Sequence, residues 1–192
     1  MIIIIEGTDL VGKTQLAKKI DELSVHYDNR FRYRHLGPLP PDFTCKDYYP
    51  LMIDFSVLDR FFMSELAYGM TIRGSTFLTD DDIFDLESKL MEVGVFEVYC
   101  RASERRIADA YRWAEKTGRK ELFSLDQILK VQKEYDRILD PETSPYSSVF
   151  GPDLTVDLYE NMETDTFDIN VFDDRVDEIA RYILNMTRKS ED

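Results

Sequence analysis

The residues of this chain that are best suited to chemistry lie together near its start, between Gly7 and Thr14. This segment fits the pattern GxxxxGK[ST] at every fixed position. Glycines let the backbone wrap closely around phosphate oxygens, the lysine bridges the β- and γ-phosphates, and the hydroxyl residue ligates Mg²⁺. The pattern therefore predicts a site for the phosphates of a nucleotide and for Mg²⁺, formed by Gly7, Thr8, Asp9, Leu10, Val11, Gly12, Lys13, Thr14 and Gln15.

The segments on either side of this loop support the same interpretation. Residues 2–5 are four consecutive isoleucines, which is typical of a strand covered on both faces in the middle of a parallel sheet. After the loop, Leu16, Ile20 and Leu23 have the i, i+4, i+7 spacing of an amphipathic helix. A buried strand therefore leads through the loop into a helix, whose N-terminal dipole favours bound phosphate.

The remaining chain alternates between strand-like and helix-like segments. Strands are expected at 31–36, 51–58, 95–100 and 167–172, with 154–160 competing for the last of these. Helices are expected at 61–70, behind Thr79 with Asp82, at 103–116, behind Ser124 with Gln127, and around 176–183. This alternation predicts one α/β domain over residues 1–192, with a mainly parallel central sheet flanked by helices.

Composition limits the classes of partner. The chain has 24 Lys and Arg against 38 Asp and Glu, and this net charge of −14 disfavours long nucleic acid. Cys45 and Cys100 are expected as free thiols, since a chain of this size needs no disulfide, and the cytoplasm is the expected compartment. Residues 1–5 are too short for the apolar region of a signal peptide, and no run approaches the roughly 20 apolar residues of a membrane span. A homodimer is compatible with these features.

Two motifs resemble one enzyme family. The segment EGTDLVGKT at 6–14 resembles the EGxDxxGKT loop of thymidylate kinases and their nucleotide-kinase relatives, including phage enzymes. The segment DRFFMSELAY at 59–68 resembles the DR(Y/F)xxSxxAYQ motif of the same family. The order and spacing of these motifs cover most of the chain. The resemblance implies the three-layer fold of P-loop NTPases with a helical lid, and transfer of a phosphoryl group from ATP to a deoxynucleoside monophosphate, most simply dTMP.

The resemblance also implies a role for each matching residue. Asp59 would hold a water on Mg²⁺, with Thr14 as the other metal-binding residue. Arg60 would grip the acceptor phosphate through its guanidinium fork. Asp9 would accept a hydrogen bond from the sugar 3′-hydroxyl, and Tyr68 would lie against the sugar ring. Phe62 would pack on the base.

A basic segment lies where the family has its lid over ATP. Residues 101–120, RASERRIADAYRWAEKTGRK, form an island of positive charge in an acidic chain. Phosphoryl transfer needs positive charge that neutralises the negative charge of the transferred group. The lid is expected at about 101–122, and Arg112 and Arg119 are its candidate catalytic residues, together with Lys13, Asp9 and Arg60.

Three departures from the family affect the acceptor. The family often has Arg-Glu-Pro-Gly after its second strand, whereas this chain has RHLGP at 34–38 and lacks the glutamate. A nucleoside hydroxyl needs a carboxylate there to accept its proton and a monophosphate does not, so the absence favours a monophosphate. Gly69 replaces a glutamine, and Glu65 occupies a helix position that can face the base. A carboxylate there favours a base bearing an amine or hydroxyl donor.

Other interpretations remain open at this point. The acceptor could be a hydroxyl of a deoxynucleoside or of a hydroxymethylated pyrimidine, with Asp9 as a substitute base. From a different class, the chain could be a P-loop module that senses a nucleotide, although a sensor needs no second phosphate site. The spacing of His26 and His35 indicates no metal site, so both are expected as surface or hydrogen-bonded histidines.

Overall fold

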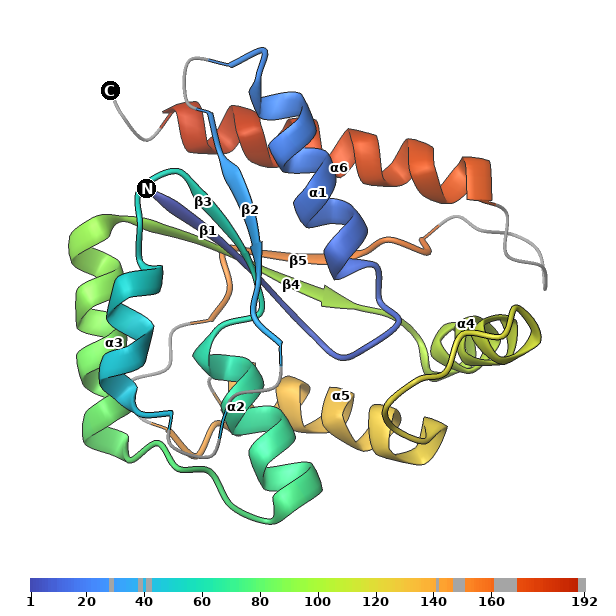
Figure 1. Ribbon diagram of the computed structural model, residues 1–192, viewed down its shortest axis with the longest axis horizontal. Coiled ribbons are helices and arrows are strands. Elements are labelled where there is room, and N and C mark those ends of the chain that lie inside the picture. Colours follow the sequence, from blue (N-terminus) through green and yellow to red (C-terminus); the bar gives the residue numbers. More distant parts are fainter. Residues whose placement is uncertain are drawn as a thin grey trace.

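The computed structural model describes residues 1–27, 30–37, 40, 43–140, 142–146, 151–160 and 169–189. Five strands and six α-helices follow one another along these residues, with a 3₁₀ segment η1 and a π-helical segment η2 (Figure 1). In chain order they are β1 (Ile2–Glu6), α1 (Lys13–Ser24), β2 (Arg32–His35), η1 (Cys45–Leu51), β3 (Ser56–Asp59), α2 (Phe62–Tyr68), η2 (Gly69–Arg73), α3 (Asp80–Val93), β4 (Val95–Arg101), α4 (Glu104–Lys116), α5 (Leu125–Leu139), β5 (Leu154–Asp157) and α6 (Ile169–Lys189).

The strands form one parallel sheet in the order β2-β3-β1-β4-β5. The isoleucine strand β1 is central, as expected, with Ile4 level with Leu58 on one side and Glu97 on the other. Every residue of β1 is buried because helices cover both faces of the sheet. The turns after the strands therefore meet at a single edge of the sheet.

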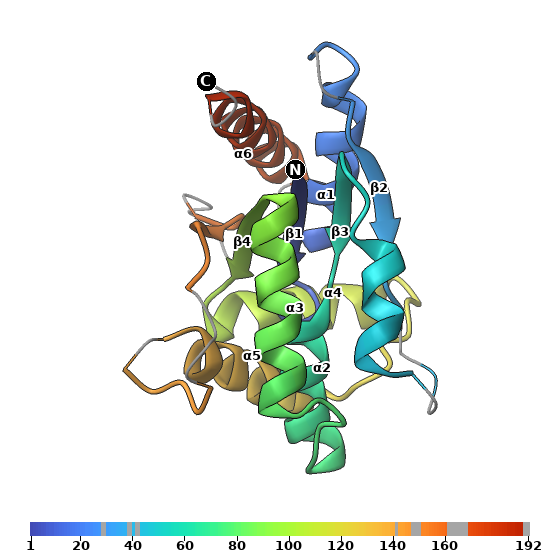
Figure 2. The same ribbon diagram turned by 90° about the vertical axis from the view of Figure 1, so that its left-hand side faces the viewer.

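Two apolar layers enclose the sheet. Ile3 and Ile5 pack against the layer that contains α1 and α6, whereas Ile2 and Ile4 pack against the layer of η1, α2, α3 and α5. Figure 2 shows α1 and α6 on the opposite side of the strands from α2 and α3. The three-layer α/β fold expected from the sequence is confirmed.

The ends of several elements differ from the sequence-based expectation. The strand expected at 51–58 is shorter, because Leu51 still belongs to η1 and only Ser56–Asp59 pair with neighbouring strands. The strand expected at 167–172 is wrong over its described part, since α6 begins at Ile169. The competing segment holds the last strand, β5. Phe172, Val176 and Ile183 have helical spacing, and all three are buried in the layer with α1.

The predicted helix starts and thiols are confirmed. Thr79 with Asp82 and Ser124 with Gln127 form reciprocal capping boxes at α3 and α5. Both cysteines are buried free thiols. Within the described ranges, no helix is long and apolar enough to cross a membrane.

Candidate functional site

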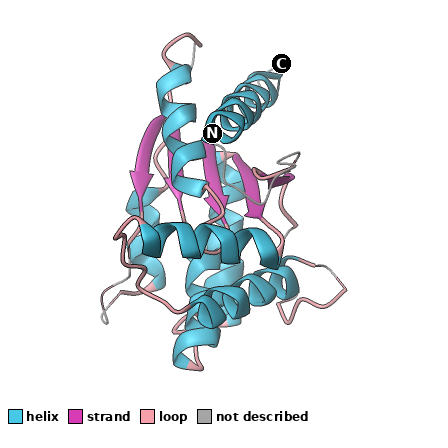
Figure 3. Cartoon of the chain, turned by 90° about the vertical axis from the view of Figure 1, so that its right-hand side faces the viewer, coloured by secondary structure: helices cyan, strands magenta, loops and turns pink. Residues whose placement is uncertain are grey.

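The loop between β1 and α1 follows the carboxyl end of β1. The helices α4 and α5 lie on this side of the sheet (Figure 1), and Figure 3 shows the same side from the right of that view. Gly7 and Gly12 both have positive φ, 138° and 85°. A Cβ at Gly7 would lie 2.1 Å from the carbonyl oxygen of Cys100, and one at Gly12 would lie 2.7 Å from Leu158 Cδ1. Gly12 is the N-cap of α1 and no side chain caps that helix, so its first amides stay available for an anion. The loop therefore has the close-wrapped backbone that phosphate binding requires.

Lys13 lies inside this loop with 5% of its surface exposed. Its ammonium donates a hydrogen bond to the backbone carbonyl of Thr8. Burial and then the charge of Arg60 lower the pKa of Lys13, while Asp9 and Asp59 oppose the shift. A buried cation whose charge is disfavoured by its surroundings is well prepared to bind an anion such as phosphate.

Asp59, at the end of β3, is fully buried beside the loop. Its Oδ2 accepts a hydrogen bond from Thr14 Oγ1 at 2.6 Å. The same oxygen lies 2.9 Å from His35 Nδ1. Its Oδ1 is buried and has no hydrogen-bond partner in the described part of the chain. A hydroxyl next to a carboxylate with an unused oxygen is a suitable oxygen-donor set for Mg²⁺.

No group of three or more His, Cys, Asp or Glu side chains among the described residues could hold a metal ion by itself. A cation at Thr14 and Asp59 would thus take its other ligands from water and from nucleotide phosphates, which is how Mg²⁺ commonly binds.

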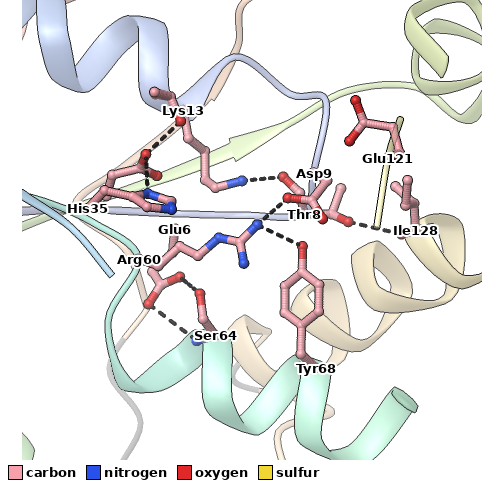
Figure 4. Close-up of polar contacts among 12 residues, drawn as sticks. Glu6, Thr8, Asp9, Lys13, His35, Arg60, Ser64, Tyr68, Glu121 and Ile128 are labelled. Atoms are coloured by element: carbon pink, nitrogen blue, oxygen red, sulfur yellow. Dashed lines mark hydrogen bonds and ion pairs between the residues drawn. The ribbon is translucent and has the colours of Figure 1, made fainter. Parts of the chain in front are cut away.

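Arg60 follows Asp59 and is held by its neighbours (Figure 4). Its guanidinium donates to Asp9 and, at 3.5 Å, to Tyr68 Oη, and it lies 4.8 Å from the centre of the Tyr68 ring. Burial alone would lower the pKa of Arg60, but Tyr68 and Asp9 raise it above its ordinary value. Its Nε is buried without a hydrogen-bond partner among the described residues. The side chain is therefore a fixed cation with spare hydrogen-bonding capacity.

Glu6 positions the segment that carries Arg60. Arg60 has a φ of 77°, an uncommon conformation for a residue with a side chain. Glu6 accepts hydrogen bonds from the backbone N–H of Phe61, the residue directly after Arg60, at 2.7 Å and from Ser64 Oγ at 2.6 Å. Tyr135 Oη donates to the same carboxylate at 2.8 Å. Sequence reasoning gave Glu6 no role, although it is the first letter of the family-like EGTD segment.

Two cavities open at this edge of the sheet. The first, about 520 Å³, is named the donor-side cavity because the nucleotide donor is expected there. It is lined by residues 9–10 and 12–15 together with residues of α4 and α6, whereas Val11 is buried in the core. The acceptor-side cavity, about 360 Å³, is lined mainly by α2, η2 and residues 119–123. The two share four lining residues: Asp9, His35, Arg60 and Arg119. A group bound in one cavity can therefore reach a group bound in the other at this junction.

His35 is a site residue that the sequence did not reveal. It was expected only as a surface or hydrogen-bonded histidine, and it is about half exposed and bonded to Asp59. However, it also lines both cavities. No motif placed β2 beside β3, so no signal in the sequence connected residue 35 with residue 59.

The structure separates the two arginines expected in the lid. Arg119 lines both cavities and its Nε lies 2.9 Å from Glu121 Oε1. Arg112 points elsewhere: its side chain is 66% exposed, pairs with Asp109 and lines neither cavity. Of the two arginines, only Arg119 therefore lines the cavities.

The base-facing residues are only partly where the sequence placed them. Phe62 is fully buried, packs edge-on against Phe61 and does not line the acceptor-side cavity, so this side chain cannot stack on a ligand there. Phe61, its neighbour and the N-cap of α2, does line that cavity, although it is only 2% exposed and packs in the same core cluster. Glu65 and Tyr68 both line the cavity.

No family model and no curated protein match this sequence. Among solved structures, YorR from Bacillus subtilis in complex with phosphorylated GDP is similar with a TM-score of 0.70 at 17% identity, over 100% of this chain and 98% of that one. Deoxyadenosine kinase from M. mycoides with bound dCTP is similar with a TM-score of 0.52 at 16% identity, over 97% of this chain and 100% of that one. These similarities and the geometry above show that the chain has the three-layer α/β P-loop fold.

Proposed function

We propose that this protein is a kinase that transfers the γ-phosphoryl group of ATP, with Mg²⁺, to the phosphate of a deoxynucleoside monophosphate. The observation that carries this proposal is the junction of the two cavities at Asp9, His35, Arg60 and Arg119. A protein that only binds or senses one nucleotide needs the first cavity alone. An acceptor next to the donor phosphates is what phosphoryl transfer requires.

The donor side supplies the groups that would hold ATP. The loop amides and Lys13 would bind its phosphates, and Thr14 with Asp59 would hold Mg²⁺, whose role is to neutralise charge on the phosphates. Arg119, at the junction, would add a second positive charge there. The solved structures that share this fold contain phosphorylated GDP and dCTP, which supports a nucleotide as ligand.

The acceptor side favours an anionic acceptor. Arg60 is a partly buried, always-protonated cation at the point where the acceptor's reacting group must lie. A phosphate would use its spare capacity, whereas a neutral hydroxyl would not. The family resemblance names dTMP or a related pyrimidine nucleotide as that acceptor. A kinase for a nucleoside hydroxyl would instead need Asp9 or His35 to accept a proton.

The test is a transfer assay with ATP, Mg²⁺ and a panel of monophosphates and their parent nucleosides. We expect diphosphate to form from at least one monophosphate and no product from the nucleosides. In Arg60→Ala, the KM for the acceptor should rise and kcat should fall by tenfold or more. ATP affinity should stay nearly unchanged, because the loop amides and Lys13 would still hold the ATP phosphates while Arg60 would hold the acceptor phosphate. Phosphorylation of nucleosides alone would refute a monophosphate acceptor, and an equal loss of ATP binding would move Arg60 to the donor site.

A further inference from the structure

An ion pair closes part of the acceptor-side cavity. Arg73, the last residue of η2, donates to Glu65 Oε1, and both side chains line the cavity. Gly69 lies beneath this contact: a Cβ there would be 2.8 Å from the Arg73 guanidinium and 3.0 Å from Glu65 Oε1. Gly69 is the position where the resembling family has a glutamine. Its lack of a side chain therefore makes room for the pair.

The two oxygens of Glu65 are used differently. Oε1 also accepts from Thr76 Oγ1 at 3.3 Å and from the N–H of Phe77 at 3.4 Å. Oε2 takes none of these hydrogen bonds. The donors on Oε1 fix the carboxylate and leave the second oxygen as an acceptor for a ligand.

The pair has a deep end and a shallow end. The side chain of Glu65 is 3% exposed, whereas that of Arg73 is 51% exposed. Neither residue belongs to the four that the two cavities share. An acceptor whose phosphate lies at Arg60 would place its base in the unshared part of the cavity, where Glu65 forms the interior and Arg73 the rim.

In that part of the cavity, the bases differ in the groups that they carry at the edge farthest from the sugar. Cytosine and adenine carry an amine at this edge beside a ring nitrogen that accepts a hydrogen bond, whereas thymine, uracil and guanine carry a carbonyl beside a ring N–H. A carboxylate accepts from an amine and repels a carbonyl oxygen, and a guanidinium donates to the bare ring nitrogen.

We infer that the Glu65–Arg73 pair over Gly69 selects a deoxynucleoside monophosphate whose base carries this distal amine. This inference rests on the proposed function. The preferred acceptors are dCMP or dAMP rather than the dTMP that the family resemblance implies. This assigns to Arg73 and Gly69 a role in specificity that neither motif indicates.

The test compares ligands that differ only at the distal group, dCMP with dUMP and dAMP with dIMP. Binding to the full chain is measured by calorimetry without ATP, and transfer is measured separately with ATP and Mg²⁺. We expect the amine-bearing member of at least one pair to bind about tenfold more tightly. Glu65→Gln should bring that ratio close to one, because an amide can donate to a carbonyl as well as accept from an amine.

Two further variants make the result interpretable. Arg73→Gln changes a half-exposed side chain and should also reduce the ratio, which keeps the inference testable if Glu65→Gln does not fold. Glu92→Gln makes the same chemical change on the exposed surface of α3 and should leave the ratio unchanged.

The outcomes separate the inference from the proposed function. Amine selectivity that depends on Glu65 supports the inference even if no phosphoryl group is transferred, and in that case only the proposed function fails. Equal or reversed binding within both pairs, or a ratio that neither variant changes, overturns the inference even if transfer occurs. Absence of any monophosphate binding overturns both.

Discussion

Replacing Lys13 by Met should abolish nucleotide binding and yet stabilise the protein in the absence of nucleotide. Lys13 is 5% exposed, and among the described residues its ammonium makes a hydrogen bond only to the backbone carbonyl of Thr8. Since burial and Arg60 together outweigh Asp9 and Asp59 and leave the pKa of Lys13 lowered, the folded state disfavours its charge. Met keeps most of the buried aliphatic volume and removes the charge.

The expected size follows from these opposing terms. Replacing buried charged groups by apolar ones of similar volume can stabilise a protein by about 1–4 kcal/mol. Loss of the hydrogen bond to Thr8 destabilises it by about 1 kcal/mol. We expect a net gain of about 1 kcal/mol in the free energy of unfolding. For a chain of this length, that raises Tm by about 2–4 °C.

The gain should depend on pH in a definite direction. Below the folded-state pKa of Lys13 the group is protonated in both states, so the cost of its burial is present in full. Above the unfolded pKa, near 10.5, it is neutral in both states and the cost vanishes. The advantage of Lys13→Met should therefore shrink as pH rises toward that value.

Thermal unfolding followed by circular dichroism, with and without ATP and Mg²⁺, measures both effects. Wild-type protein should gain stability from ATP and the variant should not. A fall in Tm of more than about 4 °C without nucleotide would refute the reasoning, because it would mean that Lys13 supports the fold rather than waits for a ligand.

Two further predictions concern the metal and the lid. Asp59→Asn should weaken the dependence of ATP binding on Mg²⁺ and lower kcat by about a hundredfold or more, since it removes the carboxylate with the unused oxygen; an unchanged Mg²⁺ titration would place the metal elsewhere. Arg119→Ala should lower kcat by tenfold or more, whereas Arg112→Ala, its matched control, should leave kcat unchanged because Arg112 lines neither cavity. Steady-state kinetics with saturating substrates measures kcat for both variants. An equal loss of kcat in the two would mean that the lid changes conformation before transfer.

Much of the fold could be predicted because it depends on local patterns. The uninterrupted isoleucines before Gly7 could form only a strand covered on both faces, and the capping pairs fixed where α3 and α5 begin. The last strand was uncertain for the same reason. Residues 154–160 and 167–172 are both short apolar segments, so their pattern alone could not decide between them. In the structure α6 begins at Ile169, and Phe172 and Val176 are buried in the layer with α1.

The candidate site likewise has features that the sequence predicted and features that only the tertiary structure shows. The sequence by itself predicted the GxxxxGK[ST] loop, the Asp59–Arg60 pair and the basic segment as site residues, because each is a short run of contiguous residues that forms a recognisable motif. Only the tertiary structure decided that His35 meets Asp59 and that Arg119 rather than Arg112 faces the cavities. It also turned Phe62 into the core and folded Arg73 back over Gly69 onto Glu65. These contacts depend on which strands are neighbours and on how a helical turn is wound, and a side chain's type and position in the chain specify neither.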